Sequence, residues 1–531
     1  MSLSNPTSTK ARAESTGMFR LADGRNLAFT FILVSSLFLL WGFCNGMIDV
    51  MDKHFQKELH LSLAQSAWVQ FAHYLGYFLM ALPAGWLATK LGYKGGIIAG
   101  LLMVGAGGLW FIPATEIAAF WAFLLGVCVI AAGLTFLETI ANPYTTVLGP
   151  KQYSATRINL AQSCNGVGWV FGPIAGGMFF YGKDAAGNST GAEMLWIPYA
   201  GVAVVVLILA VIFYFAKVPD IKAEDDYHLD DADGNLKTAA TPDREVARGT
   251  VYILTLLNAA VMIGICSMIL WLFLSLFKIA PTIGQMAAGA AAVFAVAAVM
   301  LIGITMKMSH HSIWSHPHFS AAILAQFFYV AAQAGIFSFF INYMTSQTPG
   351  IPEWWGAGML RDWFETSKAG VFGLSDQGAS NLASVGFVCF LAGRFTGAGL
   401  LRKYSAHKLL GLYALINVVV CALIFCKLGW ISVACVFLSY FFMSIMFPTI
   451  FALGIFGLGA RAKKASAFIV MAIMGGAILP KLMGAVADEY DISRGFIVPL
   501  VCFGIVAIYG LSWSWLSKAD SLRGISPAAG H

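Results

Sequence analysis

The chain has 531 residues, of which 59% are hydrophobic and 11% are charged, and its formal net charge is +6. Soluble proteins carry about 25% charged residues, so this composition excludes an ordinary soluble protein. Lys and Arg residues lie in short segments between long apolar runs rather than on one basic face, which argues against a nucleic-acid-binding protein. The nine Cys form no CxxC pair and no metal-ligand spacing, so we expect neither a disulfide framework nor a bound metal.

Apolar runs of about 20 residues, each long enough to cross a bilayer as a helix, recur along almost the whole chain. Membrane-spanning β-strands would instead give alternating segments of about 10 residues. The sequence therefore predicts an all-α polytopic membrane protein with fourteen transmembrane helices. The predicted spans are 27–51, 64–89, 94–113, 117–146, 155–181, 194–216, 250–276, 283–306, 317–345, 377–401, 406–426, 429–457, 464–487 and 495–517.

Basic residues in the connectors predict how the chain is oriented. The N-terminal segment is basic, as are the connectors at 90–94, 151–157, 402–408 and 461–464, whereas the alternate connectors hold few Lys or Arg. Basic loops stay on the cytoplasmic side, so we expect both termini in the cytoplasm and the protein in a bacterial inner membrane. The first apolar run is too long for a cleaved signal peptide. The Trp-rich connector 346–376 is expected outside, as a short helix in the membrane interface.

An internal repeat predicts two bundles. Residues 143–173 can be laid on residues 448–480, since each stretch has Pro-x-x-x-x-Leu-Gly, a basic turn, paired glycines and a closing Pro. Such correspondence is typical of transporters built from repeats, with the binding site between them. Residues 250–306 have no counterpart, so we interpret them as an insertion outside the transport site. The expected parts are a cytoplasmic segment (1–26), a six-helix bundle (27–217), an acidic cytoplasmic linker (218–249), an inserted two-helix segment (250–316), a second six-helix bundle (317–517) and a cytoplasmic tail (518–531).

Polar residues are densest in residues 136–168, where they interrupt two apolar runs. Glu138 lies in the last turns of the first run, and an acid at membrane depth costs about 3 kcal/mol on insertion scales, so it usually faces a cavity or a partner. Asn142 lies one helical turn later on the same face. A carboxylate and an amide placed in this way suit a hydroxyl-rich ligand, so we expect both to bind substrate.

Further polar residues line other spans. Asn159, Gln162 and Asn165 recur at i, i+3 and i+6 in the fifth span. Hydrogen bonding between helices, worth about 0.6 kcal/mol on average, is the alternative to a substrate contact for these residues. The other candidates of this kind are Gln326, Tyr329, Gln333 and Asn342, with Tyr74, Tyr77 and His73 earlier and Phe340 or Tyr343 for stacking.

Two basic residues, Arg394 and Lys481, lie more than five residues from either end of a predicted span. Arg394, near the end of its span, is interpreted as part of a structural or gating ion pair, and Lys481 as a charge that compensates a carboxylate. Residues 177–183 match part of a phosphate-binding loop, but Asp184 stands where Ser or Thr is required, so no ATPase is predicted. The His-rich turn from Ser309 is expected to be a solvated loop rather than a metal site.

Several segments carry a resemblance to a known family. They are FLLWGFCNGMIDVMDKHF in the first span, FLETIANPYTTVLGP and RINLAQSCNGVG around the fourth and fifth, and AQFFYVAAQAGIFSFFINY and MSIMFPTIFALGI in the second half. In these segments the chain resembles the fucose–proton symporter family of the major facilitator superfamily. The resemblance implies a major facilitator fold, here with two helices inserted between two six-helix bundles.

The resemblance also implies roles for particular residues. The family's functional carboxylates fall on Asp49 and Glu138, which are expected to carry the transported proton, and Asn45 in the first span is a further substrate-binding candidate. Asp52 and Lys53 follow directly, so the alternative for Asp49 is a helix-end charge.

The expected function is import of a neutral hexose, of the fucose, glucose, galactose or N-acetylglucosamine class, by proton symport with alternating access. A neutral sugar brings no charge, so uphill transport needs a coupled ion, which a buried acid can accept. Sodium coupling, a non-transporting sugar sensor and a channel are the alternatives. We expect no enzymatic activity and no cofactor, and a monomer in the lipid bilayer.

Overall fold

The computed structural model describes residues 18–20, 24–58, 60–149, 154–180, 195–219, 248–276, 282–308, 312–351, 363–366, 372–401, 404–456, 458 and 462–517. The first six helices make up what we call the first half. They are α1 (Ala28–Glu58), α2 (Leu63–Ser66), α3 (Trp68–Ile117), α4 (Phe120–Val147), α5 (Ser154–Phe180) and α6 (Trp196–Phe215). Next come α7 (Arg248–Leu276), α8 (Ile283–Met306) and the 3-10 turn η3 (Ile313–Ser315).

The remaining helices form the second half. They are α9 (Pro317–Ser338), α10 (Phe340–Gln347), α11 (Asp376–Leu401), α12 (Ala406–Phe425), α13 (Trp430–Met443), α14 (Met446–Ile455), α15 (Ala462–Met471), α16 (Gly475–Glu489), α17 (Ile492–Gly495) and α18 (Ile497–Ser517), with a 3-10 turn, η7 (Ala472–Met474), between α15 and α16. Helix therefore occupies part of every predicted span. Among the described residues, twelve helices are long and apolar enough to cross a membrane, so the count of fourteen stays a prediction.

Helix α3 contains two of the predicted spans. It bends at Gly92, whose φ of 69° and ψ of −177° are not helical. Glycine adopts a positive φ without the steric cost that a Cβ brings, so the chain can turn here within one residue. The bend falls inside the basic connector predicted at 90–94.

The connector before α11 forms strands rather than the predicted interfacial helix. In its described part, β1 (Phe364–Thr366) pairs antiparallel with β2 (Phe372–Leu374), and the rings of Phe364 and Phe372 stack at 5.6 Å. The Ser375 amide donates to the Trp363 carbonyl at 2.8 Å, which fixes the hairpin to the start of α11. For these residues the prediction of a helix was wrong, because pairing with a second strand satisfies the backbone groups that a helix would have satisfied.

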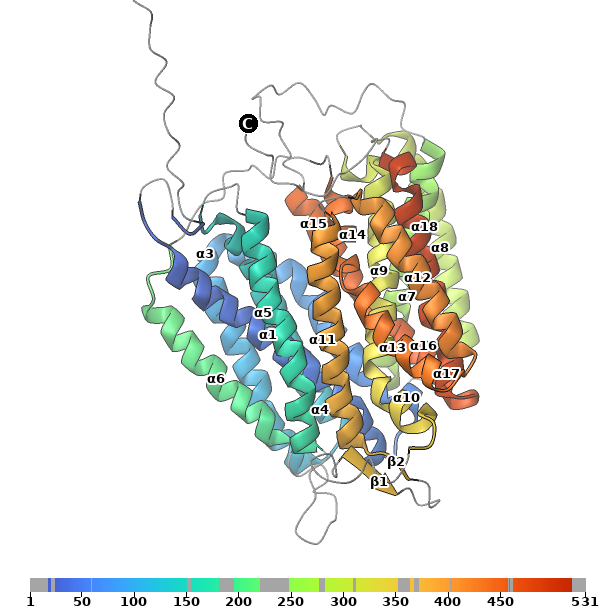
Figure 1. Ribbon diagram of the computed structural model, residues 1–531. Helices are drawn as coiled ribbons and strands as arrows, with labels where there is room; N and C mark the ends of the chain where they lie inside the picture. The colour runs from blue at the N-terminus through green and yellow to red at the C-terminus, as the bar shows by residue number, and fades with distance from the viewer. Residues whose placement is uncertain are drawn as a thin grey trace, which may run out of the picture.

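The halves pack along two seams (Figure 1). Within the first half α3 packs on α4 and α6, and α1 on α5; within the second, α9 packs on α16 and α18, and α12 on α18. Between the halves, α5 lies against α11 along one seam, as Figure 1 shows, and the contacts between residues place α3 against α16 along the other. Helix α7 packs on α8 and α9, at the right of Figure 1. The interface between the halves is therefore the long internal surface where a site shared by both can lie.

Small residues let α1 and α5 cross closely. A Cβ at Gly168 would overlap the carbonyl of Leu39, and one at Gly42 would overlap the carbonyl of Asn165. Such close approach is typical of glycines at helix contacts within membranes. It holds the polar segment of α5 directly against α1.

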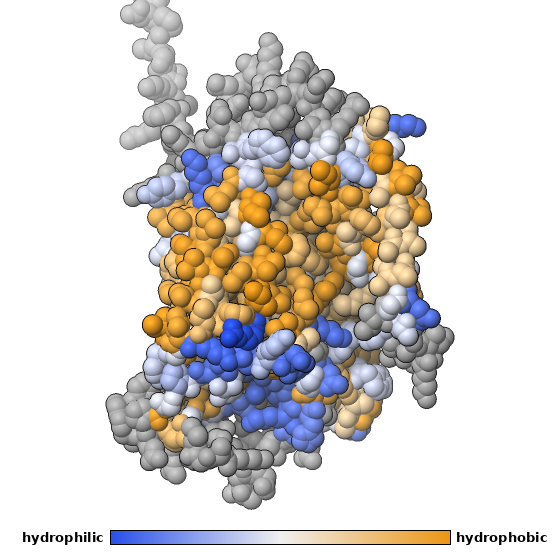
Figure 2. Space-filling model, turned by 90° about the vertical axis from the view of Figure 1, so that its right-hand side faces the viewer, coloured by the Kyte–Doolittle hydropathy of each residue, from blue (hydrophilic) through white to orange (hydrophobic). Residues whose placement is uncertain are grey.

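An apolar belt crosses the face of the structure that Figure 2 shows. Figure 2 shows hydrophobic side chains across the middle of one face and polar side chains at both ends. On α8 the exposed residues include Val296, Val299 and Met300. Helix α1 begins and α18 ends at the upper end in Figure 1, which we call the terminal end, whereas β1, β2 and α17 lie at the lower end, which we call the hairpin end. The belt has the arrangement expected for a protein that spans a bilayer.

Candidate substrate and proton site

Glu138 lies buried on α4, with 7% of its surface exposed. Its Oε2 atom has no hydrogen-bond partner among the described residues. Tyr77 of α3 lies close enough to Glu138 for the two groups to interact electrostatically, and the indole Nε1 of Trp41 donates to the Tyr77 hydroxyl at 2.5 Å. Burial disfavours the charged form of a carboxyl group, so a group in this position suits a proton or a hydrogen-bonding ligand.

Other polar groups of the first half surround Tyr77. The Asn45 side chain of α1 approaches the Tyr77 hydroxyl, and its own Oδ1 is buried without a partner among the described residues. His73 lies one turn before Tyr77, with ring centroids 5.1 Å apart, and its Nδ1 is also unpartnered there. Helices α1, α3 and α4 thus place Asn45, His73 and Glu138 around the side chain of Tyr77.

The amides of α5 are arranged as a pair. The Asn165 Nδ2 atom donates to the Gln162 Oε1 atom at 3.2 Å, while the Asn165 Oδ1 atom is buried with no partner in the described part of the chain. Part of the predicted set is therefore bonded within α5, and one acceptor stays available. The side chains of Asp49, Asn142 and Asn159 lie outside the described residues.

In the second half, Gln326 of α9 is the strongest candidate. It is fully buried, and neither its Oε1 nor its Nε2 has a hydrogen-bond partner among the described residues. An unsatisfied buried polar group costs about 1–3 kcal/mol, so such a side chain suits a polar ligand. Gln333 is half-buried on the same helix.

Two other candidates join helices instead. The Tyr329 hydroxyl donates to the Met443 carbonyl at 3.0 Å. The Asn342 Nδ2 atom donates to the Gln56 Oε1 atom of α1 at 2.6 Å, at the hairpin end. Both side chains already have structural partners, and their contact with substrate stays a prediction.

The two intramembrane cations face aromatic rings. The Arg394 guanidinium lies 5.0 Å from the Phe390 ring centroid, and its Nε is unpartnered among the described residues. The Lys481 Nζ lies 3.2 Å from the Trp68 ring centroid and 5.7 Å from that of Trp271. Neither forms an ion pair with a described carboxylate, so within that part of the chain Lys481 compensates no acid. Desolvated contacts of this kind contribute about 2 kcal/mol.

Sequence reasoning missed Trp169 of α5. Its ring contacts Phe337 of α9 at 5.4 Å and Phe387 of α11 at 4.8 Å, so it joins the halves. The predicted stacking residues Phe340 and Tyr343 instead pack within the second half, against Tyr440 and Phe496. Its spacing could have indicated this position, because Trp169 follows Asn165 by one helical turn and therefore lies on the same face of α5.

Polar contacts between the halves gather at the hairpin end. Lys57 of α1 forms a salt bridge with Asp376 of α11, and the Leu63 amide donates to the Asp488 Oδ1 atom at 2.8 Å. The contact between Gln56 and Asn342 lies at the same end. At the terminal end, by contrast, Arg157 donates to carbonyls of its own half; they belong to Met18, Thr145 and Gly149. The halves are therefore closed on each other at the hairpin end.

Two helical halves that meet around buried, unpartnered polar groups, inside an apolar belt, define the architecture of a secondary transporter. Residues 27–351 match the family model of the Major Facilitator Superfamily, and the chain belongs to this superfamily. The expected major facilitator fold is confirmed, while the inserted pair of helices stays a prediction.

Relatives and solved structures agree with this assignment. The chain is 30% identical over 504 residues to the L-fucose-proton symporter of Escherichia coli (strain K12), covering 92% of this chain and 93% of that protein. It is 26% identical over 513 residues to the glucose/galactose transporter of Brucella abortus biovar 1 (strain 9-941), with coverage of 96% and 99%. The crystal structure of the transporter FucP in the outward conformation is similar with a TM-score of 0.57 and 29% identity, covering 92% of this chain and all of that one. The resemblance to the fucose–proton symporter family is thereby confirmed.

Proposed function

We propose that this protein is a secondary active transporter that imports a neutral hexose together with a proton. The observation that carries the proposal is Glu138, a buried carboxyl group with an unpartnered oxygen next to Tyr77. Relatives named as a fucose–proton symporter and a glucose/galactose transporter support the substrate class. The protein acts as a transporter rather than an enzyme, and it needs no cofactor.

The sugar binds between the halves. Sugar hydroxyls both donate and accept hydrogen bonds, so they match the unpartnered atoms of Asn45, Asn165 and Gln326. Asp49 and Glu138 carry the proton. The full proposed set of substrate residues is Asn45, Glu138, Asn142, Asn159, Gln162, Asn165, Gln326, Tyr329, Gln333 and Asn342.

The predicted domain boundaries and orientation complete the proposal. Two six-helix bundles (27–217 and 317–517) flank the linker 218–249 and the inserted segment 250–316, and both termini lie in the cytoplasm of a bacterial cell as part of an inner-membrane monomer. Helix α1 begins and α18 ends at the same end of the structure, which supports placing both termini on one side of the membrane, and the basic connectors favour the cytoplasmic side. On this orientation the hairpin end faces outward.

Uptake into proteoliposomes tests the function. We expect fucose, glucose, galactose or N-acetylglucosamine to accumulate when an inward proton gradient is imposed, and accumulation to stop when a protonophore collapses the gradient. Accumulation driven by a sodium gradient alone would show that the coupled ion is sodium rather than a proton. Sugar binding without any flux would instead favour a sensor.

The hairpin end, which faces outward on this orientation, is closed in this structure, whereas the similar FucP structure is described as outward. Two conformations of this kind support alternating access. We propose that the salt bridge of Lys57 and Asp376, with Lys481 on Trp68, forms part of an outer gate. Arg394 is proposed as a second gating residue at the other end of α11. Opening the hairpin end must break the contacts that join α1 to α11 and α3 to α16.

Removing the salt bridge should therefore favour the outward-open state. The Lys57 side chain is 53% exposed but that of Asp376 only 7%, so the pair contributes at least the ~1 kcal/mol of a good exposed pair, and Asp376→Asn should raise the outward-open population about fivefold or more. The measurement is labelling, by an impermeant thiol reagent, of a single cysteine placed at Asn45 in a variant that lacks the native cysteines.

A second ion pair at the same end provides a matched control. Lys427 Nζ lies 2.7 Å from an Asp491 oxygen, within the second half. Burial opposes ionisation of Asp491, but hydrogen bonds from Lys427 and from the Arg494 amide outweigh it and hold the pKa of Asp491 below its usual range. Lys427→Gln should leave the labelling rate unchanged. Equal changes of the labelling rate in Asp376→Asn and Lys427→Gln would contradict the proposal that the Lys57–Asp376 salt bridge is part of the outer gate.

A further inference from the structure

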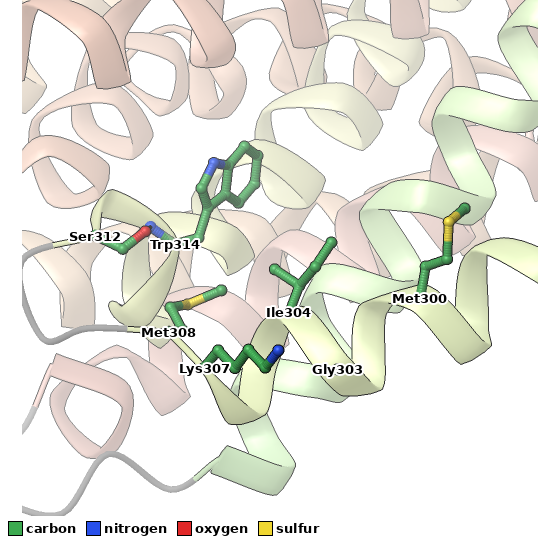
Figure 3. Close-up of a pocket in the computed structure, with 7 residues that line it drawn as sticks. All are labelled: Met300, Gly303, Ile304, Lys307, Met308, Ser312 and Trp314. Carbon is green, nitrogen blue, oxygen red and sulfur yellow. The ribbon is translucent and has the colours of Figure 1, made fainter.

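A pocket of about 620 Å³ opens where α8 ends, at the terminal end. It contains none of the proposed sugar or proton residues. Its lining comes from the last turns of α8, from the two residues that follow α8, and from η3 with its capping residue (Figure 3): Met300, Gly303, Ile304, Lys307, Met308, Ser312 and Trp314.

One wall of the pocket is apolar and continues onto the outside of α8. Met300, Gly303 and Ile304 recur at i, i+3 and i+4, so they share one face of the helix. Met300 and Ile304 are both more than half exposed, and a Cβ added at Gly303 would meet nothing within 4 Å. This apolar part of the pocket, which we call the apolar groove, is therefore open to the belt.

The other end of the pocket carries a cation. Lys307 follows Ile304 by one turn and is exposed, and it has no ion-pair partner among the described residues. In Figure 3 the side chains of Met300, Ile304 and Lys307 follow one another along α8, with Met308 beside Lys307. A positive charge thus ends a row of apolar side chains at the border of the belt.

The wall opposite α8 is preformed. Ser312 caps η3, since its Oγ accepts from the Trp314 amide at 3.3 Å and its carbonyl accepts from the Ser315 hydroxyl at 2.6 Å. The Trp314 ring packs against Phe319 and Phe468, with centroids 5.4 and 5.1 Å away. These contacts hold Trp314 in place without a ligand, and Trp is enriched where polar headgroups meet acyl chains.

We propose that this pocket binds an anionic phospholipid, with the phosphate at Lys307 and an acyl chain along Met300 and Ile304. A single exposed lysine holds a free anion weakly, so the apolar groove must supply the rest of the affinity. One Lys near the membrane surface contributes about 1 kcal/mol to the binding of an anionic headgroup. The proposal is independent of the transport assignment, because no residue of the sugar or proton site takes part.

Native mass spectrometry of the full-length protein tests the site. The purified protein is titrated with phosphatidylglycerol or with phosphatidylcholine that carries the same acyl chains. We expect one phosphatidylglycerol molecule to be retained more strongly than phosphatidylcholine. Lys307→Met should weaken that retention about fivefold, the effect of one basic residue near a headgroup, while Lys307→Arg retains it.

Glycine variants test the apolar groove separately. In Gly303→Leu the leucine side chain fits without a clash but occupies the apolar groove, so this variant should retain less phosphatidylglycerol. Gly289→Leu is the matched control, because it also meets nothing within 4 Å and lies on the same helix away from the pocket. Equal retention of both lipids by the wild type, or unchanged phosphatidylglycerol retention in Lys307→Met, would overturn the proposal. Displacement of phosphatidylglycerol by millimolar inorganic phosphate would overturn it too, since it would indicate a headgroup site without a chain.

Discussion

Glu138→Gln is expected to abolish uphill sugar uptake in a protein that still folds. The substitution keeps the shape of the side chain but removes the group that can take up a proton. Hydrogen bonds to a charged group contribute about 1.5–3 kcal/mol, so sugar affinity should also fall roughly tenfold or more if the carboxylate contacts a hydroxyl. Gradient-driven uptake and equilibrium sugar binding in proteoliposomes measure the two effects separately.

Glu116→Gln is the matched control for this variant. Glu116 lies exposed near the end of α3, so the same chemical change there should leave uptake and binding normal. Normal uptake with normal affinity in Glu138→Gln would show that the buried carboxyl group serves neither the proton nor the sugar.

Asp49→Asn is expected to separate coupling from binding. If Asp49 carries the transported proton, the amide mimics a permanently protonated carrier. Such a carrier can reorient with sugar bound, because no unneutralised charge crosses the low-dielectric barrier, but it cannot use a proton gradient. We expect loss of concentrative uptake with retained exchange of labelled for unlabelled sugar across the membrane.

The alternatives for Asp49 give different results in the same assays. A helix-end charge predicts nearly normal uptake and exchange, as we expect for Asp52→Asn, the control on the same helix. Loss of exchange as well as uptake, in a variant shown to be folded, would make Asp49 part of the sugar site or of the gate.

The helices could be predicted because their signal is local. An apolar run of bilayer length needs no knowledge of its neighbours, and even the bend of α3 at Gly92 fell inside a predicted connector. The hairpin of β1 and β2 could not be predicted in this way, because each strand depends on a partner and on the Trp363 carbonyl that accepts from Ser375.

The site was predictable only in part. Polar residues in apolar runs pointed to Glu138, Asn165 and Gln326, and all three are buried with an unpartnered polar atom among the described residues. Contacts between distant parts of the chain left no such signal. The position of Lys481 against Trp68 depends on how α16 packs on α3, which no local pattern encodes.

Helix α7 lies beside the seam between α3 and α16, and this position constrains any rocking of the halves. Its Ile265 packs in one cluster with Phe71 of α3 and Phe327 of α9. The Asn258 amide of α7 donates to the Ser320 carbonyl of α9 at 2.9 Å, so α7 is tied to the second half. In the proposed alternating-access motion, α3 is therefore expected to slide along α7 as it moves away from α16, because α7 stays with the second half. Helix α7 would then cover the opening between α3 and α16 and keep acyl chains out of it.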